Sequence, residues 1–153
     1  MKKKYDIIVI GACPSGICAA IQATQTGAST LLIEKNGICG GTTVSAGVDF
    51  IGLFHAWGKQ VISGIGWDIV VKTIKECGGV FPDYSNYIRP HWKLHTHLNP
   101  YIYAAISEET VIDSGAEILY HTLLASVEWQ KEKWNLQICG KEGLRNLSAK
   151  VLI

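Results

Sequence analysis

The stretch Tyr5–Gly16, YDIIVIGACPSG, followed by Ser29–Glu34, STLLIE, decides the fold of this chain. Tyr5–Ile10 is a short apolar run of the kind that forms a buried parallel strand, and a turn rich in small residues follows it. From about Ser15 to Thr26, small and apolar residues recur at helical spacing, and a glycine stands where the helix would end. Because Ser29–Glu34 is a second buried strand, these residues predict a βαβ unit with a crossover helix of nearly minimal length.

The remaining residues continue the alternation of helix and strand and then add a meander. Asn99-Pro100 is a favourable helix start, a capping residue followed by proline, and this helix is expected to end near Ser114-Gly115. A further helix, a third buried strand and three alternating segments are predicted at Trp67–Cys77, Glu117–His121, Leu123–Trp129, Trp134–Ile138 and Leu147–Ile153. Residues 36–45 are expected to be a loop or a helix entry, and residues 46–66 and 80–98 show no clear element. The predicted fold class is α/β, a Rossmann-like parallel sheet with crossover helices plus a small antiparallel β-meander.

Composition restricts the class of protein. The 153 residues give room for one domain, and an apolar share of 48% with a charged share of 18% is typical of a globular chain. The net charge of +1 provides no basic field that would attract nucleic acid. No apolar stretch is long enough to span a membrane, and the five cysteines show neither a disulfide framework nor zinc-ligand spacing. We therefore expect a cytoplasmic protein without nucleic-acid, membrane or metal partners.

The glycine turn between the first strand and the first helix has the chemistry of a pyrophosphate site. A helix N-terminus presents unpaired N–H groups and a partial positive charge, provided that the backbone can approach the ligand closely. Gly11 permits the tight turn, Gly16 allows the helix to pack on the strand, and Glu34 lies 23 residues after Gly11, where an acid can hold a ribose. Cys13 stands where the dinucleotide fingerprint has its second glycine, and its side chain adds bulk. A strand–turn–helix that binds no ligand is the alternative interpretation of this segment.

In these motifs the chain resembles the N-terminal part of the FAD-dependent oxidoreductases of glutathione-reductase-type fold. The resemblance runs through Tyr5–Gly11, Leu31–Lys35 and the Gly40-Gly41-Thr42 motif, and continues through the helix and strand after Asn99 to Ala149–Ile153. Residues 50–98 are its least distinctive part. The resemblance implies FAD as cofactor and hydride transfer by the flavin on an unidentified small molecule. It identifies no catalytic side chain.

The resemblance also implies which residues would face the cofactor. The turn Gly11, Ala12, Cys13, Pro14, Ser15 and Gly16 would contact the pyrophosphate, and Glu34 the adenosine ribose. Lys35 would lie beside the adenine end, and Leu124 would border the adenine through its backbone. Gly40, Gly41 and Thr42 would pass near the pyrophosphate and the flavin.

Two departures from the family pattern matter. Disulfide reductases of this fold carry C-x-x-x-x-C directly after Gly-Gly-Thr, and here Thr43 and Val48 occupy the two cysteine positions, so thiol–disulfide chemistry is not expected. Cys39 is expected to be a structural thiol. The chain ends in the apolar run Ala149–Ile153, where the family continues with the rest of its flavin site. We therefore expect residues 1–153 to be the N-terminal portion of an FAD-binding domain, with the last strand and the substrate domain missing.

Several alternatives remain open from the sequence. The chain could be an NAD-binding dehydrogenase domain, which the Gly40-Gly41 motif and the meander argue against. It could also be an inactive or truncated remnant that binds nucleotide weakly or serves as an interaction module. The partner of this chain could be a second copy of itself, in a homo-oligomer, or a missing C-terminal half. His91, His95 and His97 form no complete metal-ligand set, and His91 or His95 is a candidate general acid or base.

Overall fold

The first third of the chain folds into the predicted βαβ unit. The computed structural model describes residues 2–153, and its strand β1 (Lys4–Ile10) pairs in parallel with β2 (Thr30–Ile33) in the register Ile8 to Leu31. The crossover helix α1 (Pro14–Gln25) begins with proline at its first position, where a missing N–H costs no hydrogen bond. All four β2 residues are buried, as expected for a parallel strand covered on both faces.

The second half completes a six-stranded sheet in the order β5-β2-β1-β8-β7-β6. Helix α4 (Pro100–Asp113) starts at the predicted cap, and the Asn99 side chain accepts hydrogen bonds from the backbone of Tyr101 and Ile102. The strands that follow are β5 (Glu117–Leu119), β6 (Leu123–Gln130), β7 (Lys133–Gly140) and β8 (Gly143–Leu152). The long strand β8 pairs antiparallel with β7 through its first part and parallel with β1 through its last part. The predicted α/β class, with a parallel sheet and a meander, is therefore confirmed.

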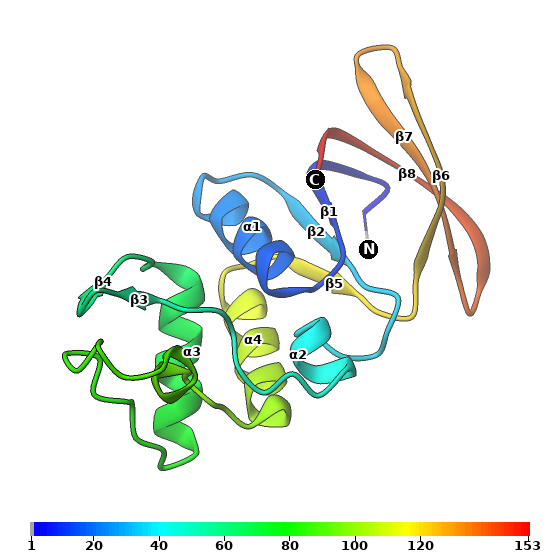
Figure 1. Ribbon diagram of the computed structural model, residues 1–153. Coiled ribbons are helices and arrows are strands. Elements are labelled where there is room, and N and C mark those ends of the chain that lie inside the picture. Colours follow the sequence, from blue (N-terminus) through cyan, green and yellow to red (C-terminus); the bar gives the residue numbers. More distant parts are fainter. Residues whose placement is uncertain (1) are drawn as a thin grey trace.

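Each face of the parallel sheet has its own cover. Because side chains alternate along a strand, Val9 and Leu32 point into a core formed with the helices, where Ile17, Ile69 and Tyr103 are buried. Ile8 and Leu31 point to the other face, against Leu136, Ile138 and Leu147 of the meander. The helices and the meander therefore lie on opposite sides of the sheet (Figure 1).

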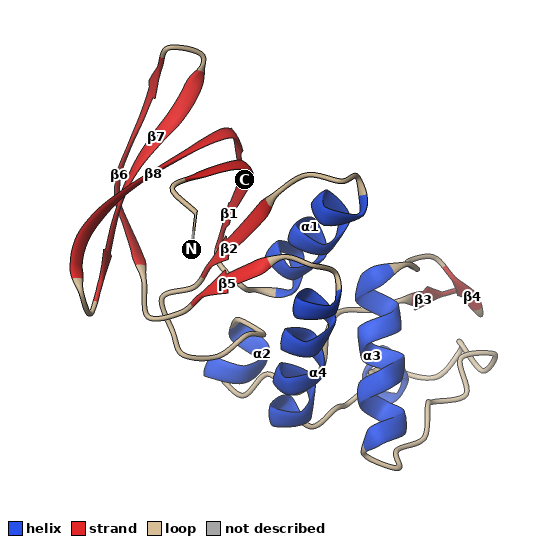
Figure 2. Ribbon diagram, turned by 180° about the vertical axis from the view of Figure 1, so that it is seen from behind, coloured by secondary structure: helices blue, strands red, loops and turns tan. Residues whose placement is uncertain are grey.

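The segment that gave no clear prediction forms a lobe between two helices. We use "the lobe" for residues 47–98, which follow the single-turn helix α2 (Thr42–Ser45) and precede α4. It contains a short hairpin, β3 (His55–Ala56) and β4 (Lys59–Gln60), the helix α3 (Ile65–Glu76) and a 3₁₀ turn, η1 (His91–Leu94). Its aromatic centre is Trp67, whose ring lies 5.0 Å from Phe54 and 5.3 Å from Phe81, centroid to centroid. The lobe and the β6–β7 hairpin project from opposite ends of the molecule (Figure 2).

The third parallel strand is shorter than predicted. It ends at Leu119, not at His121, because the next two residues leave the sheet. The Tyr120 hydroxyl donates to Glu108 of α4 at 2.8 Å and lies 3.1 Å from the Cys39 sulfur. His121 then adopts a left-handed backbone conformation with φ of 51°, which extended strands exclude. No helix in residues 2–153 has both the length and the apolar character needed to cross a bilayer.

Candidate functional site

The turn between β1 and α1 has the close backbone packing that the sequence predicts. Gly11 has φ of +99°, a conformation that favours glycine. A Cβ atom at Gly16 would lie 1.9 Å from the Gly11 carbonyl oxygen, so only glycine fits at this position of the helix. The first turn of α1 thus lies directly on the end of β1, with its N–H groups facing away from the helix. Such a helix start is suited to an anion.

Cys13 fits this turn without backbone strain. It is the N-cap of α1, with φ of −75° and ψ of 170°, an extended conformation open to any residue. Its sulfur lies 3.1 Å from the Ser15 hydroxyl. Partial burial opposes ionisation of the thiol, but the Ser15 hydroxyl and the backbone amides of the turn outweigh it, so the pKa of Cys13 is lowered. The side chain of Cys13 packs beside Gly41. A Cβ atom at position 41 would lie only 2.7 Å from the Cys13 Cβ, so the absence of a side chain at Gly41 makes room for the bulk that the sequence predicts.

The Gly-Gly motif rests against the same turn. The Gly40 amide donates to the Ala12 carbonyl at 2.8 Å, which fixes the motif beside the start of α1. Gly41 is the N-cap of α2, with φ of 54°, and Thr42 is exposed at the first position of that helix. The structure therefore brings Gly40, Gly41 and Thr42 next to the turn predicted to bind the pyrophosphate, although they lie more than twenty residues away in sequence.

Glu34 lies at the carboxyl end of β2 and is nearly enclosed. Its side chain is 5% exposed, and its two oxygens accept hydrogen bonds from the backbone amides of Ala12, at 2.7 Å, and Asn36, at 2.8 Å. These bonds compensate for burying a charge and hold the carboxylate in one orientation. A carboxylate has about four acceptor positions, so two amide donors leave capacity for ribose hydroxyls.

A pocket of about 280 Å³ opens beside this carboxylate. It is lined by Ile10, Gly11, Ile33, Glu34, Lys35, Thr122, Leu123 and Leu124. Four of the residues predicted to bind the cofactor, namely Gly11, Glu34, Lys35 and Leu124, therefore line one cavity at the carboxyl ends of β1 and β2. In open α/β sheets this is the edge where ligands bind.

One residue that lines the pocket, Thr122, and its neighbour His121 were not identified from the sequence. Thr122 is buried, and its backbone amide donates to the Glu34 carbonyl at 3.0 Å, which ties the start of β6 to the end of β2. The His121 ring lies against Gly37, where a Cβ would be 2.6 Å from it, and its amide donates to the Asn36 carbonyl. No local sequence signal marks these residues, because the contacts join segments more than eighty residues apart.

Thr43 and Val48, which stand at the two cysteine positions of the disulfide reductases, differ in their exposure to solvent. Thr43 is buried in α2 and Val48 is exposed in the loop that follows. Cys39 is completely buried against Tyr120, and burial raises the pKa of its thiol. Burial, together with Cys39 and Glu108, likewise raises the pKa of the Tyr120 hydroxyl. Within residues 2–153, no three His, Cys, Asp or Glu side chains are grouped so that they could hold a metal ion.

The residues present fit FAD. The glycine turn that excludes a Cβ, the helix start and the buried carboxylate beside a pocket match a pyrophosphate followed by an adenosine. When bound, FAD supplies the redox chemistry, and the protein supplies position and electrostatics.

Comparisons with known proteins agree with this assignment. The sequence model of the FAD-dependent oxidoreductases matches residues 6–153. NADH:fumarate oxidoreductase of Klebsiella pneumoniae is 48% identical over 44 residues, which cover 29% of this chain and 5% of that protein. Dihydrolipoyl dehydrogenase of Trypanosoma brucei brucei is 43% identical over 53 residues, covering 34% of this chain and 11% of that protein.

Solved structures show the same fold at low identity. A flavoprotein/dehydrogenase from Cytophaga hutchinsonii superposes with a TM-score of 0.63 at 16% identity, covering 97% of this chain and 38% of that chain. The anhydrotetracycline hydroxylase OxyS from Streptomyces rimosus superposes with a TM-score of 0.61 at 17% identity, covering 97% and 31%. The chain thus spans 31–38% of these structures and a smaller part of the curated relatives. Since the family match extends over nearly all of its length, the chain belongs to the family of FAD-dependent oxidoreductases, and its cofactor is FAD.

Proposed function

We propose that this chain holds the ADP portion of FAD for an oxidoreductase that transfers hydride between the flavin and a small molecule. The observation that carries the proposal is the buried Glu34 carboxylate, which lines the pocket next to the glycine turn and is held by two backbone amides. An acid at this position favours an unphosphorylated ribose, as in the adenosine of FAD.

The proposal excludes thiol–disulfide exchange. The two positions where disulfide reductases carry their redox pair are Thr43 and Val48, neither of which can form a thiolate. Cys39 is close in sequence, but its thiol is enclosed by the core and its pKa is raised. These features support direct reaction of the flavin with its substrate.

Cofactor binding is tested by incubating the purified chain with FAD, FMN or NAD⁺, followed by desalting and absorption spectroscopy. We expect FAD to be retained, with its two visible bands, and FMN to be lost because it lacks the adenosine that the pocket recognises. A colourless protein after FAD would contradict the proposal and support a remnant that does not bind cofactor. Retention of NAD⁺ in place of FAD would favour an NAD-binding dehydrogenase domain.

The type of chemistry is tested on the FAD-loaded chain under anaerobic conditions. Dithionite is expected to bleach the flavin, while dihydrolipoamide, a dithiol, is expected to leave it oxidised over the same period. Rapid bleaching by the dithiol would show thiol-to-flavin electron transfer and would refute the exclusion of thiol–disulfide chemistry.

A further inference from the structure

One histidine of the lobe is held by a carboxylate. Nδ1 of His97 lies 3.0 Å from Oδ2 of Asp49, although the two residues are 48 positions apart. An isolated antiparallel bridge joins the segments that carry them: the Leu98 amide donates to the Asp49 carbonyl at 2.8 Å, and Phe50 is bridged to His97. The backbone therefore fixes the pair.

This arrangement leaves the other ring nitrogen available for proton transfer. A carboxylate only accepts hydrogen bonds, so Nδ1 of His97 carries the hydrogen and Nε2 is the basic nitrogen of the neutral ring. The side chains of His97 and Asp49 are 59% and 51% exposed, which makes the pair accessible to a bound small molecule. A base oriented by a second residue is the arrangement used in general acid–base catalysis.

The neighbouring histidines lack this arrangement. Within residues 2–153, His97 is the one histidine within 4 Å of a carboxylate. His95 stacks on Phe50, with ring centroids 4.2 Å apart, and His91 packs edge-on against Trp92 on the η1 turn. The geometry thus favours His97 over His91 and His95, the two candidates suggested by the sequence.

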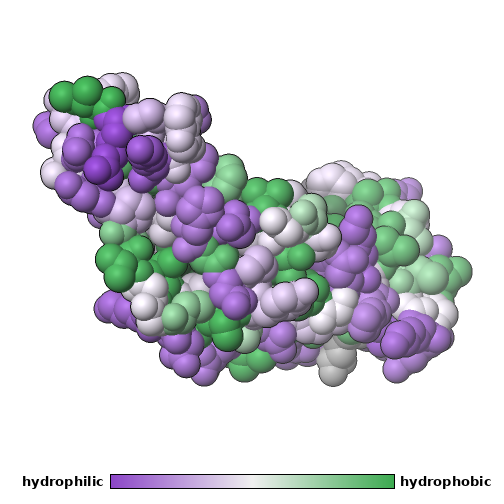
Figure 3. All heavy atoms as spheres, turned by 60° about the horizontal axis from the view of Figure 1, so that its bottom comes forward, coloured by the Kyte–Doolittle hydropathy of each residue, from purple (hydrophilic) through white to green (hydrophobic). Residues whose placement is uncertain are grey.

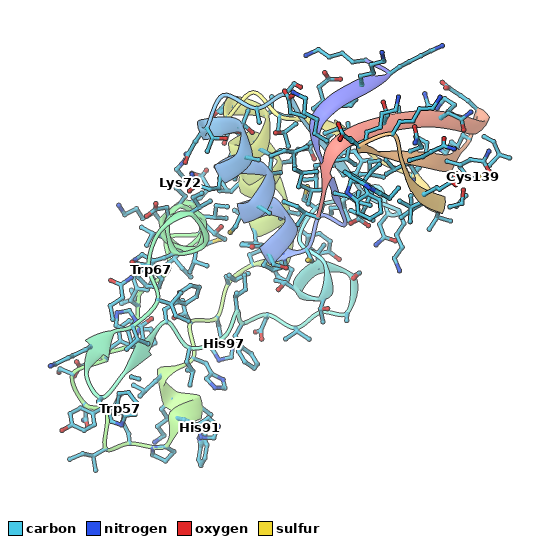
Figure 4. The ribbon with its side chains drawn as sticks, turned by 90° about the horizontal axis from the view of Figure 1, so that it is seen from above. Trp57, Trp67, Lys72, His91, His97 and Cys139 are labelled. Atoms are coloured by element: carbon cyan, nitrogen blue, oxygen red, sulfur yellow. The ribbon has the colours of Figure 1, made fainter. Side chains whose placement is uncertain are left out.

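Each member of the pair lies close in sequence to an element next to the Gly-Gly motif. Asp49 follows Gly41 by eight residues, and half of that distance is the single turn of α2. His97 precedes α4, and the Tyr103 ring of that helix borders Gly40. A Cβ atom at Gly40 would lie 3.4 Å from this ring. Figure 4 shows His97 on the segment that leads toward α4, and His91 on the turn farther out. Hydrophilic residues are prominent on the exposed end of the lobe (Figure 3).

We propose that Asp49 and His97 form the acid–base pair at the flavin end of the site, an inference that rests on the proposed function. The Gly40 amide joins the Gly-Gly motif to the glycine turn, and Asp49 follows the motif by eight residues, so a cofactor that extends from the turn past the motif would approach the pair. For a substrate with an H–C–O–H or H–C–N–H group, Nε2 of His97 takes the proton from oxygen or nitrogen. When bound, FAD would accept the electron pair of the C–H bond as a hydride while the C=O or C=N bond forms.

The position of the pair is tested by NMR of the chain with ¹⁵N-labelled histidine, assigned with single His→Gln variants. The probes are ADP, which has the adenosine and the pyrophosphate, and FAD, which adds the flavin. His121 lies beside the adenosine pocket and reports that the pocket is filled. We expect ADP to shift the His121 ring resonances alone, and FAD to shift those of both His121 and His97.

The outcomes separate this inference from the proposed function. If FAD shifts His121 and leaves His97 unchanged, the site binds FAD but the acid–base pair is not at its flavin end. If neither ligand shifts His121, the proposed function fails and this inference fails with it. His55, which is stacked on Tyr84 within the lobe, serves as the internal control for indirect effects and is expected to stay unchanged.

The orienting effect of Asp49 is tested by Asp49→Asn, with the exposed Asp113→Asn of α4 as the matched control. We expect the ring ¹⁵N shifts of His97 in D49N to show a loss of the Nδ1–H form in favour of Nε2–H. D113N is expected to match the wild type. An unchanged His97 tautomer in D49N would show that Asp49 does not position the ring, which would overturn the pair.

Discussion

Glu34 shows how the fold can orient a single side chain for the proposed contact with the cofactor. Its carboxylate is fixed by the amides of Ala12 and Asn36, so its orientation is set before any ligand binds. A hydrogen bond to a charged group contributes about 1.5–3 kcal/mol, and binding to a preorganised group avoids the cost of ordering it. We predict that Glu34→Gln weakens ADP binding by about 10- to 100-fold, measured by isothermal titration calorimetry.

The matched control for this substitution is Glu76→Gln, which removes an exposed carboxylate at the end of α3. This variant is expected to bind ADP as the wild type does. If E34Q and E76Q bound ADP equally well, Glu34 would not contact the ribose. Circular dichroism of E34Q distinguishes lost binding from lost folding.

Cys13 provides an independent probe of the turn between β1 and α1, the proposed site of the pyrophosphate. Its lowered pKa increases the thiolate fraction at neutral pH, and the thiolate is the form that reacts with iodoacetamide. We predict that Cys13 is alkylated in the free protein and that saturating ADP slows this reaction about tenfold or more, because a bound pyrophosphate covers the start of α1. Peptide mass spectrometry follows each cysteine separately.

Two other cysteines complete the alkylation experiment. The exposed Cys77, at the end of α3, is expected to react at the same rate with and without ADP, and the buried Cys39 is expected to stay unlabelled. An ADP-independent rate at Cys13 would mean that the pyrophosphate does not lie on this turn.

At the scale of secondary-structure elements, two helical glycines differ in what surrounds them. A Cβ at Gly16 would overlap the Gly11 carbonyl oxygen at 1.9 Å, whereas a Cβ at Gly66 in α3 would meet the Cys18 sulfur at 3.4 Å, an ordinary contact. We predict that Gly16→Ala destabilises the protein by about 3 kcal/mol, because α1 must move off β1. Gly66→Ala is expected to stabilise by up to about 1 kcal/mol through helix propensity. Urea denaturation measures both changes, and equal effects of the two substitutions would contradict the close packing of α1 on β1.

The elements that could be predicted are those whose signal is local. The apolar runs of β1 and β2 and the Asn99 cap of α4 fixed their elements to within a residue or two. The lobe could not be predicted, because its hairpin and its Asp49–His97 pairing depend on contacts between distant segments. The same reason applies to the pocket. Glu34 could be identified from the sequence because it belongs to a motif with fixed spacing, whereas Thr122 could not, because only a distant contact brings it there. The early end of β5 also depends on a distant contact, that of Tyr120 with Glu108.

At the scale of the whole molecule, one ion pair connects three strands of the parallel sheet. Asp6 of β1 lies 2.7 Å from the Lys150 ammonium of β8, and its other oxygen accepts hydrogen bonds from the Ser29 amide and hydroxyl just before β2. Strand β8 comes from the end of the chain, so the pair joins its first and last segments. The hydrogen bonds from Lys150 and Ser29 hold the pKa of the Asp6 carboxyl well below its usual range.

This lowered pKa gives the stability of the sheet a defined pH dependence. The Asp6 carboxyl has a pKa of about 3.9 in the unfolded chain and a lower pKa in the folded protein. The stabilisation is therefore fully present above about pH 5 and is lost as the pH falls below about 4. We predict that Asp6→Asn has a lower midpoint of thermal unfolding than the wild type from pH 5 to 8, and that the difference shrinks as the pH falls from 4 to 2. Lys150→Met should show a smaller deficit with the same pH trend, because the Ser29 bonds to Asp6 remain. Melting curves of wild type and D6N that stay separated by a constant interval down to pH 2 would show that the Asp6 charge does not hold β1, β2 and β8 together.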